Sequence, residues 1–351
     1  MKLFYVALAA LAMTVVTAHT SGFNKVALAQ EQSRAKVSKV GSIGASDKLY
    51  ILNNNQVYPG NSTLFEFDVA TKKLTTISTA INGAYGGVSG SSVCGEHFYF
   101  FGAMAPIRWS LVQVNLNTGE AAYLSKQSPF LFHRIECDPN AKGEGLIAVI
   151  STISDPIFST IKYNPATENY TTIGTFPKQT WLGEDTIFSF TDDMKQLWGS
   201  FPIVNGAYRV TGSQLLTMDL ESGSVSPPVR YNGGNSKHAP YQIFPSQGSA
   251  FVGFFTDLDA TPQVVSFCSL NHGSFGIDIN DCDQVPELNN QGIPDPTCGS
   301  MYYFASFPHA TGSEQGLYAF DLSTKQTTKL AELSQIIDKN YVGAIAGVGC
   351  H

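Results

Sequence analysis

The stretch LYAFDLSTKQTTKL, residues 317–330, begins with the apolar and aromatic run LYAF, continues through Asp321 and Leu-Ser-Thr-Lys, and ends on QTTKL, a second run rich in strand-forming residues. Such a pattern is typical of two antiparallel strands joined by a short turn. An Asp at the start of the turn accepts hydrogen bonds from the amide groups that follow it, which closes a compact loop. The stretch therefore predicts a β-hairpin.

The same hairpin pattern recurs along the chain at intervals of roughly fifty residues, the period expected of four-stranded propeller blades. The other clear copies are LFEFDVATKKLTTI (64–77), LVQVNLNTGEAAYL (111–124), IKYNPATENYTTIG (161–174) and LLTMDLESGSVSPP (215–228). Their turns begin at Asp68, Asn115, Asn164 and Asp219. A degenerate sixth copy, VVSFCSLNHGSFGI (264–277), has Cys268 where the others have Asp or Asn.

Two further strand-like runs precede each hairpin, as in YGGVSGSSVC (85–94) and EHFYFFGAM (96–104). Each repeat then holds a glycine-rich inner strand, an aromatic second strand and the outer hairpin. The first repeat lacks an inner strand, whereas the chain ends on YVGAIAGVGC (341–350). Because aligning Cys350 with Cys94 also superposes Tyr341 on Tyr85, we expect this last strand to pair with the first blade, beside Leu49. The sequence predicts an all-β fold, a six-bladed β-propeller of four-stranded antiparallel blades, closed without free sheet edges.

The spacing of the six cysteines predicts three disulfides. Cys94, Cys137, Cys298 and Cys350 each lie near the end of an expected inner strand. Only the pairs Cys94–Cys137 and Cys298–Cys350 join neighbouring blades and leave none of the four unpaired, because a disulfide spans only a short distance. Cys268 and Cys282 then pair with each other.

The N-terminal residues indicate export from the cytosol. Residues 1–18 contain one lysine and a short apolar run, as a signal peptide does, with cleavage after Ala18 or alternatively after Ala29. We expect a poorly ordered extension over residues 19–43 and a single propeller domain over 44–351. The protein is then secreted, extracellular, without a membrane span and monomeric. Asn61 and Asn169 begin glycosylation sequons.

Composition excludes one class of partner. Charged residues make up 14% of the 351 residues, and the formal net charge is −7. Nucleic-acid binding normally requires a basic face, so we expect no nucleic-acid partner.

The turns FDLSTK, VNLNTG and MDLESG resemble the D-x-x-T-G turns of quinoprotein-type and Kelch-like propeller repeats. The resemblance extends from about Leu49 to the C-terminus over five of the six repeats. It implies the fold alone, since the Trp of quinoprotein repeats is missing, and the Gly-Gly pair that each Kelch blade carries occurs here only as the isolated pairs Gly86-Gly87 and Gly233-Gly234. No quinone cofactor and no catalytic residue follow from it.

Propellers bind ligands over the loops that enter the inner strands and join the second and third strands. These loops carry aromatic and basic residues that suit a sugar or peptide, because flat rings stack and polar groups fix orientation. The predicted ligand-binding residues are Arg108, Trp109, Trp181, Tyr208, Arg209, Tyr241 and Tyr341. The residues expected at the mouth of the channel are Tyr85, His133, Arg134, Asp185, Gln242 and Asp295.

Three functions follow from this reading. The first is a secreted binding protein without a cofactor, which recognises an extracellular carbohydrate, peptide or protein surface. The second is a calcium-dependent hydrolase or lactonase with its site over the channel, since Asp185 and Asp295 supply carboxylates for Ca²⁺ or for acid–base work and His133 could act as a base. For His133 the alternative is a hydrogen-bonded structural role. The third function is a structural extracellular or coat component.

Overall fold

The structure is a computed structural model that describes residues 48–54, 61–82, 85–104, 108–124, 130–141, 145–152, 155–178, 186–191, 193–204, 210–232, 238–244, 251–257, 264–273, 276–288, 293–294, 301–306, 316–332 and 341–347. These ranges belong to the second of two compact units, Gly44–His351. The predicted signal peptide and N-terminal extension lie outside them. Every regular element in these ranges is a β-strand. A search of the same residues for an apolar helix of bilayer-spanning length finds none.

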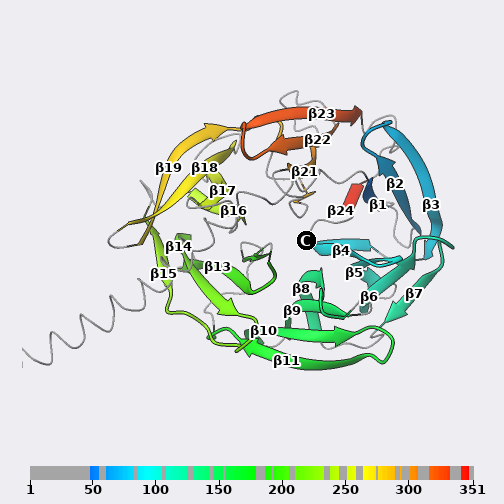
Figure 1. Cartoon of the computed structure of the whole chain (residues 1–351), viewed down its shortest axis with the longest axis horizontal. Coiled ribbons are helices and arrows are strands. Elements are labelled where there is room, and N and C mark those ends of the chain that lie inside the picture. Colours follow the sequence, from blue (N-terminus) through cyan, green and yellow to red (C-terminus); the bar gives the residue numbers. More distant parts are fainter. Residues whose placement is uncertain are drawn as a thin grey trace, which may run out of the picture. The chain divides into compact units, whose positions relative to one another are not determined.

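In the described ranges the strands form four four-stranded sheets and one eight-stranded sheet (Figure 1). The first sheet has the order β24 (Tyr341–Gly347), β1 (Lys48–Asn54), β2 (Asn61–Asp68), β3 (Lys73–Asn82). The second runs β4 (Tyr85–Cys94), β5 (His97–Met104), β6 (Arg108–Asn115), β7 (Ala121–Leu124). The third runs β8 (Phe130–Cys137), β9 (Leu146–Thr152), β10 (Asp155–Asn164), β11 (Asn169–Thr175). Another runs β20 (Ile293–Pro294), β21 (Met301–Ser306), β22 (Gly316–Asp321), β23 (Gln326–Glu332).

The eight-stranded sheet joins two sets of four antiparallel strands through their outer strands. One set is β12 (Ile187–Phe190), β13 (Gln196–Val204), β14 (Val210–Asp219) and β15 (Val229–Asn232), and the other is β16 (His238–Phe244), β17 (Phe251–Asp257), β18 (Val264–Gly273) and β19 (Gly276–Gln284). Strands β15 and β19 pair in parallel, with Tyr231 opposite Ile277. The repeat pattern did not predict this link, because it treats each set of four strands separately.

The C-terminal strand pairs with the first strand, as the sequence predicted. Strand β24 lies antiparallel to β1, from Leu49 opposite Gly347 to Asn54 opposite Tyr341. In Figure 1 the red β24 lies beside the blue β1. Residues far apart in the chain therefore share one sheet.

The five predicted turns have one common geometry. In each, the Asp or Asn oxygen accepts hydrogen bonds from backbone amides that follow it, as in Ser222 N to Asp219 Oδ1 at 2.7 Å. The hydrogen bond that the Ser222 backbone N–H donates lowers the pKa of Asp219, because it stabilises the charged carboxylate. The residue four positions after each Asx has a positive φ: Lys72, Gly119, Glu168, Gly223 and Lys325.

These turns pack against the outer strand of the preceding set of four strands. The outer strand contains an extra residue at the contact, for example Ile173, which is left over between the pairs Thr160–Gly174 and Ile161–Thr172. Ile173 packs against the apolar cluster that contains Leu220, the residue after Asp219. Ile77 with Leu116, and Leu330 with Val69, repeat the arrangement. The turn motif thus links successive sheets.

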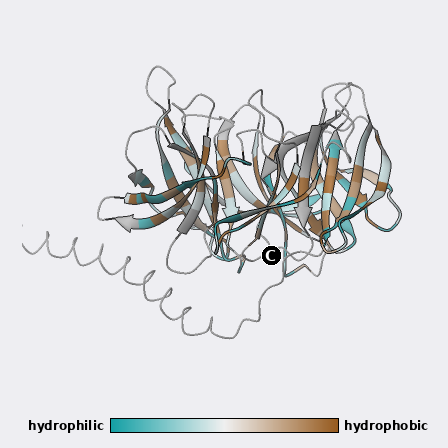
Figure 2. Cartoon of the chain, turned by 90° about the horizontal axis from the view of Figure 1, so that it is seen from above, coloured by the Kyte–Doolittle hydropathy of each residue, from teal (hydrophilic) through white to brown (hydrophobic). Residues whose placement is uncertain are grey.

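Within the described residues the core consists of six apolar clusters, each drawing on two successive sets of four strands. Representative residues are Leu52 with Phe98, Phe101 with Phe132, Val149 with Phe188, Trp198 with Phe255, Phe254 with Tyr302, and Tyr303 with Leu49. Figure 2 shows the hydrophobic segments concentrated along the strands. Burial of these side chains between sheets supplies the main stabilising term, at about 25 cal/mol per Å² of apolar surface.

Two of the three predicted disulfides lie within the described residues and are confirmed. Cys94–Cys137 joins the last residues of β4 and β8, and Cys268–Cys282 joins β18 to β19. Cys298 and Cys350 lie outside the described residues. The predicted position of Cys268 at a turn is wrong: it is fully buried in the middle of β18, and the hairpin turns after Gly273. Cysteine offers no Asx-type acceptor there, so the ladder continues past it.

Candidate functional site

The innermost strands of several sheets contain β-bulges. In β8, Phe132 pairs with Ile150 and Arg134 with Val149, so His133 is the extra residue. In β16, Tyr241 is extra between Pro240 and Gln242. A bulge changes which face the following side chains occupy, and bulges are over-represented beside functional sites. It therefore sets the direction of Arg134 and Gln242, two of the predicted channel residues.

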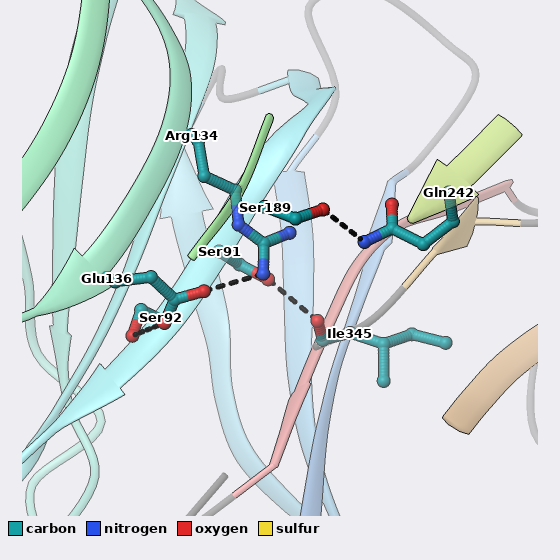
Figure 3. A network of polar contacts seen from close by, with 7 residues as sticks. All are labelled: Ser91, Ser92, Arg134, Glu136, Ser189, Gln242 and Ile345. Carbon is teal, nitrogen blue, oxygen red and sulfur yellow. Dashed lines mark hydrogen bonds and ion pairs between the residues drawn. The ribbon is translucent and has the colours of Figure 1, made fainter. Parts of the chain in front are cut away.

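A set of polar groups on the innermost strands forms what we call the inner-strand network: Ser91 and Ser92 of β4, Arg134 and Glu136 of β8, Ser189 of β12, Gln242 of β16 and the carbonyl of Ile345 in β24 (Figure 3). All of these residues are buried. They come from five segments that are distant in the sequence, so the network exists only in the folded protein.

The charged part of the network is an ion pair within β8. Arg134 Nη2 lies 2.6 Å from Glu136 Oε1, and Ser92 donates to Glu136 Oε2 at 3.3 Å. Arg134 and Glu136 are only 9% and 4% exposed. Burying two charges costs several kcal/mol per ion, which mutual attraction and hydrogen bonds must offset. The buried ion pair therefore carries a desolvation cost in free energy, which its hydrogen bonds must offset.

The neutral part of the network links other strands. Gln242 Nε2 donates to Ser189 Oγ at 3.1 Å, which joins β16 to β12. Ser91 Oγ donates to the Ile345 carbonyl at 2.8 Å, which joins β4 to β24. Short polar side chains thus bridge strands that share no backbone ladder.

Two donors of the network lack an acceptor among the described residues. Arg134 Nε is buried and makes no hydrogen bond there. Ser189 Oγ accepts from Gln242, and its own hydrogen has no acceptor in the part of the chain that the structure describes. A buried charge-assisted donor without a partner costs about 1–3 kcal/mol or more. In the view of Figure 3, Arg134 and Gln242 extend toward Ser189 from opposite sides.

His133 packs beside the network. Its Nε2 shares a 2.7 Å hydrogen bond with Ser151 Oγ, and its ring lies edge-on to Phe158 at 4.9 Å. Burial lowers the pKa of His133 to about 4, because the charged ring loses its hydration. The imidazole is therefore neutral at pH 7. These are the contacts expected for the structural alternative.

The strand register places two predicted ligand-binding residues, Arg108 and Trp109, and the predicted channel-mouth residue Tyr85 at one end of the second sheet. Tyr85 begins β4 and lies opposite Ala103 of β5, which is in turn opposite Trp109 of β6. Arg108 begins β6. Cys94 ends β4 at the opposite end, so its disulfide lies far from this row.

Of the other predicted site residues, two lie in described strands and five do not. Tyr341 begins β24, opposite Asn54, and Tyr241 is the bulge residue of β16. Trp181, Asp185, Tyr208, Arg209 and Asp295 lie outside the described residues. Among the residues that are described, no three His, Cys, Asp or Glu side chains gather as a metal site would need.

A pocket of about 370 Å³ lies on the third sheet, and none of its lining residues belongs to the network. Its lining includes Asp138, Lys162 and the sequon residue Asn169. Lys162 Nζ lies 3.6 Å from Asp138 Oδ2, which partly neutralises the pocket. Asn169 is exposed at the start of the outer strand β11, and Asn61 begins the interior strand β2.

Sequence reasoning missed Glu136, Ser91, Ser92 and Ser189. The alternation of FLFHRIEC (130–137) places Arg134 and Glu136 two residues apart, which was a usable signal. The serines gave none, because their role depends on contacts between strands that are distant in the sequence and share no backbone ladder.

Comparisons with known proteins bear on the fold. No protein-family model matches the chain, and no curated protein matches it. Among solved structures, TolB from Acinetobacter baumannii aligns with a TM-score of 0.53 and 14% identity over 82% of this chain and 63% of TolB. Tricorn protease aligns with a TM-score of 0.49 and 10% identity, over 82% of this chain and 29% of the protease. An oligogalacturonate lyase in complex with manganese aligns at 0.47, with 12% identity over 82% and 74%.

The likeness to TolB, together with the succession of antiparallel sheets, shows a β-propeller fold. At these identities it shows the fold alone. This chain spans less than two thirds of TolB and of tricorn protease. The resemblance to quinoprotein and Kelch-like repeats stays a prediction.

Proposed function

We propose that the chain is an exported ligand-binding protein, built as a closed six-bladed β-propeller. The eight-stranded sheet then counts as two blades joined through β15 and β19. The first blade takes its inner strand, β24, from the C-terminus. The six core clusters, each between successive sets of strands, support this count.

The ligand is a carbohydrate or peptide held at the strand ends that carry Tyr85, Arg108 and Trp109. The observation that carries this proposal is the register, which brings the backbones of Tyr85, Ala103 and Trp109 side by side across three strands. In this register two aromatic residues flank one alanine. Such a row suits stacking against a sugar ring or a peptide side chain.

Two features support export. The disulfides Cys94–Cys137 and Cys268–Cys282 indicate an oxidising compartment. The N-terminal pattern of residues 1–18 is that of a secretory signal. Export also allows glycosylation at Asn169, whose side chain is exposed.

The test is binding of the secreted, full-length chain to glycan and peptide arrays, followed by titration of the strongest ligand with Trp109→Ala and Tyr85→Ala. Both variants are expected to weaken binding at least tenfold with an unchanged melting temperature. Tyr170→Ala is the matched control, because Tyr170 is an exposed aromatic residue on the outer strand β11. Unchanged affinity in the first two variants contradicts the proposed face. Loss of binding on chelation would instead favour the calcium-dependent alternative.

A further inference from the structure

We infer that the inner-strand network binds one carboxylate group of the ligand, between Arg134 and Ser189. The inference rests on the proposed function and names the chemistry of the ligand. Its starting point is a mismatch between donors and acceptors inside the fold. Arg134 and Ser189 are 9% and 5% exposed, so bulk water has little access to the Arg134 Nε–H and the Ser189 O–H.

The first donor is the Arg134 side chain. A guanidinium has five N–H donors, and Glu136 accepts from Nη2. Arg134 Nε has no partner among the described residues. Charge-assisted hydrogen bonds to an oxyanion are about twice as strong as neutral ones, so a carboxylate is the acceptor that suits the Arg134 Nε–H best.

The second donor is the Ser189 hydroxyl. Its oxygen already accepts from Gln242 Nε2, which turns the hydroxyl hydrogen away from Gln242. Ser189 therefore offers a donor, and the amide of Gln242 fixes its direction. A group with two acceptor oxygens satisfies both Ser189 and Arg134.

Glu136 determines how strongly such a site holds an anion. Its carboxylate already neutralises Arg134, from 2.6 Å, in a setting with little solvent screening. An incoming carboxylate therefore meets a charge of its own sign. Replacing Glu136 by Gln keeps a hydrogen-bonding side chain of the same size and removes the competing charge, so it should increase affinity for anions.

The experiment titrates the intact secreted protein with sodium acetate at constant ionic strength, with sodium chloride as the ionic control, and measures binding by calorimetry. Two matched pairs separate the possible sources of the carboxylate: glucuronate against glucose, and a short peptide with a free C-terminus against its amide. Inorganic phosphate tests for other oxyanions. The variants are Ser189→Ala, Glu136→Gln and, as a control, Arg230→Gln, because Arg230 is exposed on β15.

The expected result is acetate binding that Ser189→Ala weakens about tenfold, that Glu136→Gln strengthens about tenfold, and that Arg230→Gln leaves unchanged. One acid should bind at least tenfold more tightly than its neutral partner. If acetate does not bind, or if Glu136→Gln does not strengthen binding in a folded variant, the inference is wrong and an enclosed water serves the two donors.

The two proposals fail separately. If neutral sugars or amidated peptides bind as tightly as the acids, and binding depends on Trp109, the carboxylate site is wrong while the binding face stands. If acetate binds through Ser189 but no glycan or peptide on the arrays does, the proposed function fails while the site stands.

Discussion

Replacing Gly223 by Ala tests whether the Asx turns hold successive sheets together. Gly223 follows Asp219 by four residues and has φ = +70°, a region that L-residues rarely adopt. A Cβ atom there would lie 2.0 Å from the Ile173 carbonyl oxygen of β11 and 3.3 Å from Gly174 Cα. The turn and the neighbouring strand therefore fit together only when this position has no side chain.

Two contributions set the size of the effect. A left-handed conformation costs an alanine roughly 1–2 kcal/mol. Displacing the β11 backbone to relieve the contact adds roughly 1–3 kcal/mol, as other overpacked sites do. We expect Gly223→Ala to lower the free energy of unfolding by about 2–5 kcal/mol. At about 2 °C per kcal/mol for a large domain, the melting temperature falls by about 4–10 °C.

Thermal unfolding followed by circular dichroism or calorimetry measures this loss. Gly212→Ala is the matched control, because a Cβ at Gly212 in β14 would meet no atom within 4 Å. The control is expected to change the melting temperature by less than about 1 °C, since a surface change away from special features costs within about 0.5 kcal/mol. Equal melting temperatures for the two variants would refute the reasoning, because the turn would then not press against β11.

Two further predictions concern the remaining described features. Because burial lowers the pKa of His133 to about 4, the unfolded chain binds more protons between about pH 6.5 and 4, and the wild type should lose up to about 3 kcal/mol of stability as the pH falls through this window. His133→Gln should lack that part of the loss when the free energy of unfolding is measured by denaturant titration at each pH. If the stability–pH curves of wild type and variant run parallel, the ring is charged in the folded protein over this window. Replacing both Cys94 and Cys137 by Ala opens a link that spans 43 residues and should cost about 4 kcal/mol. Chemical unfolding measures this cost, and a loss below about 1 kcal/mol would show that the link between β4 and β8 adds little.

The features that could be read directly from the residues are those with a local cause. An Asp or Asn such as Asp219 bonds to amides only two or three residues away, so its turn forms wherever the motif occurs. Alternation within a strand is equally local. Once repeats were aligned, the pairing of β24 with β1 and the bond Cys94–Cys137 followed, because equivalent positions in a repeat occupy equivalent places.

The candidate site was predictable only in part. Alignment of the inner strands pointed to Arg134 and Gln242, since both lie on segments expected beside the channel. It did not reveal that Glu136 neutralises Arg134 or that Ser189 accepts from Gln242. Glu136 lies on the same strand as Arg134 and could have been suspected from its two-residue spacing. Ser189 and Gln242 lie 53 residues apart on strands that share no backbone ladder, and no spacing in the chain encodes their contact.

The other features that the sequence did not predict arise where long-range packing overrides the local pattern. A bulge at His133 or Tyr241 changes the face of every residue after it, and its place depends on how neighbouring inner strands meet. The parallel contact of β15 with β19 and the buried place of Cys268 in β18 have the same origin. Hydrogen bonds between near neighbours thus determine the repeating hairpins, whereas contacts between sheets, formed only when the whole chain is folded, determine which polar groups meet and what they can bind.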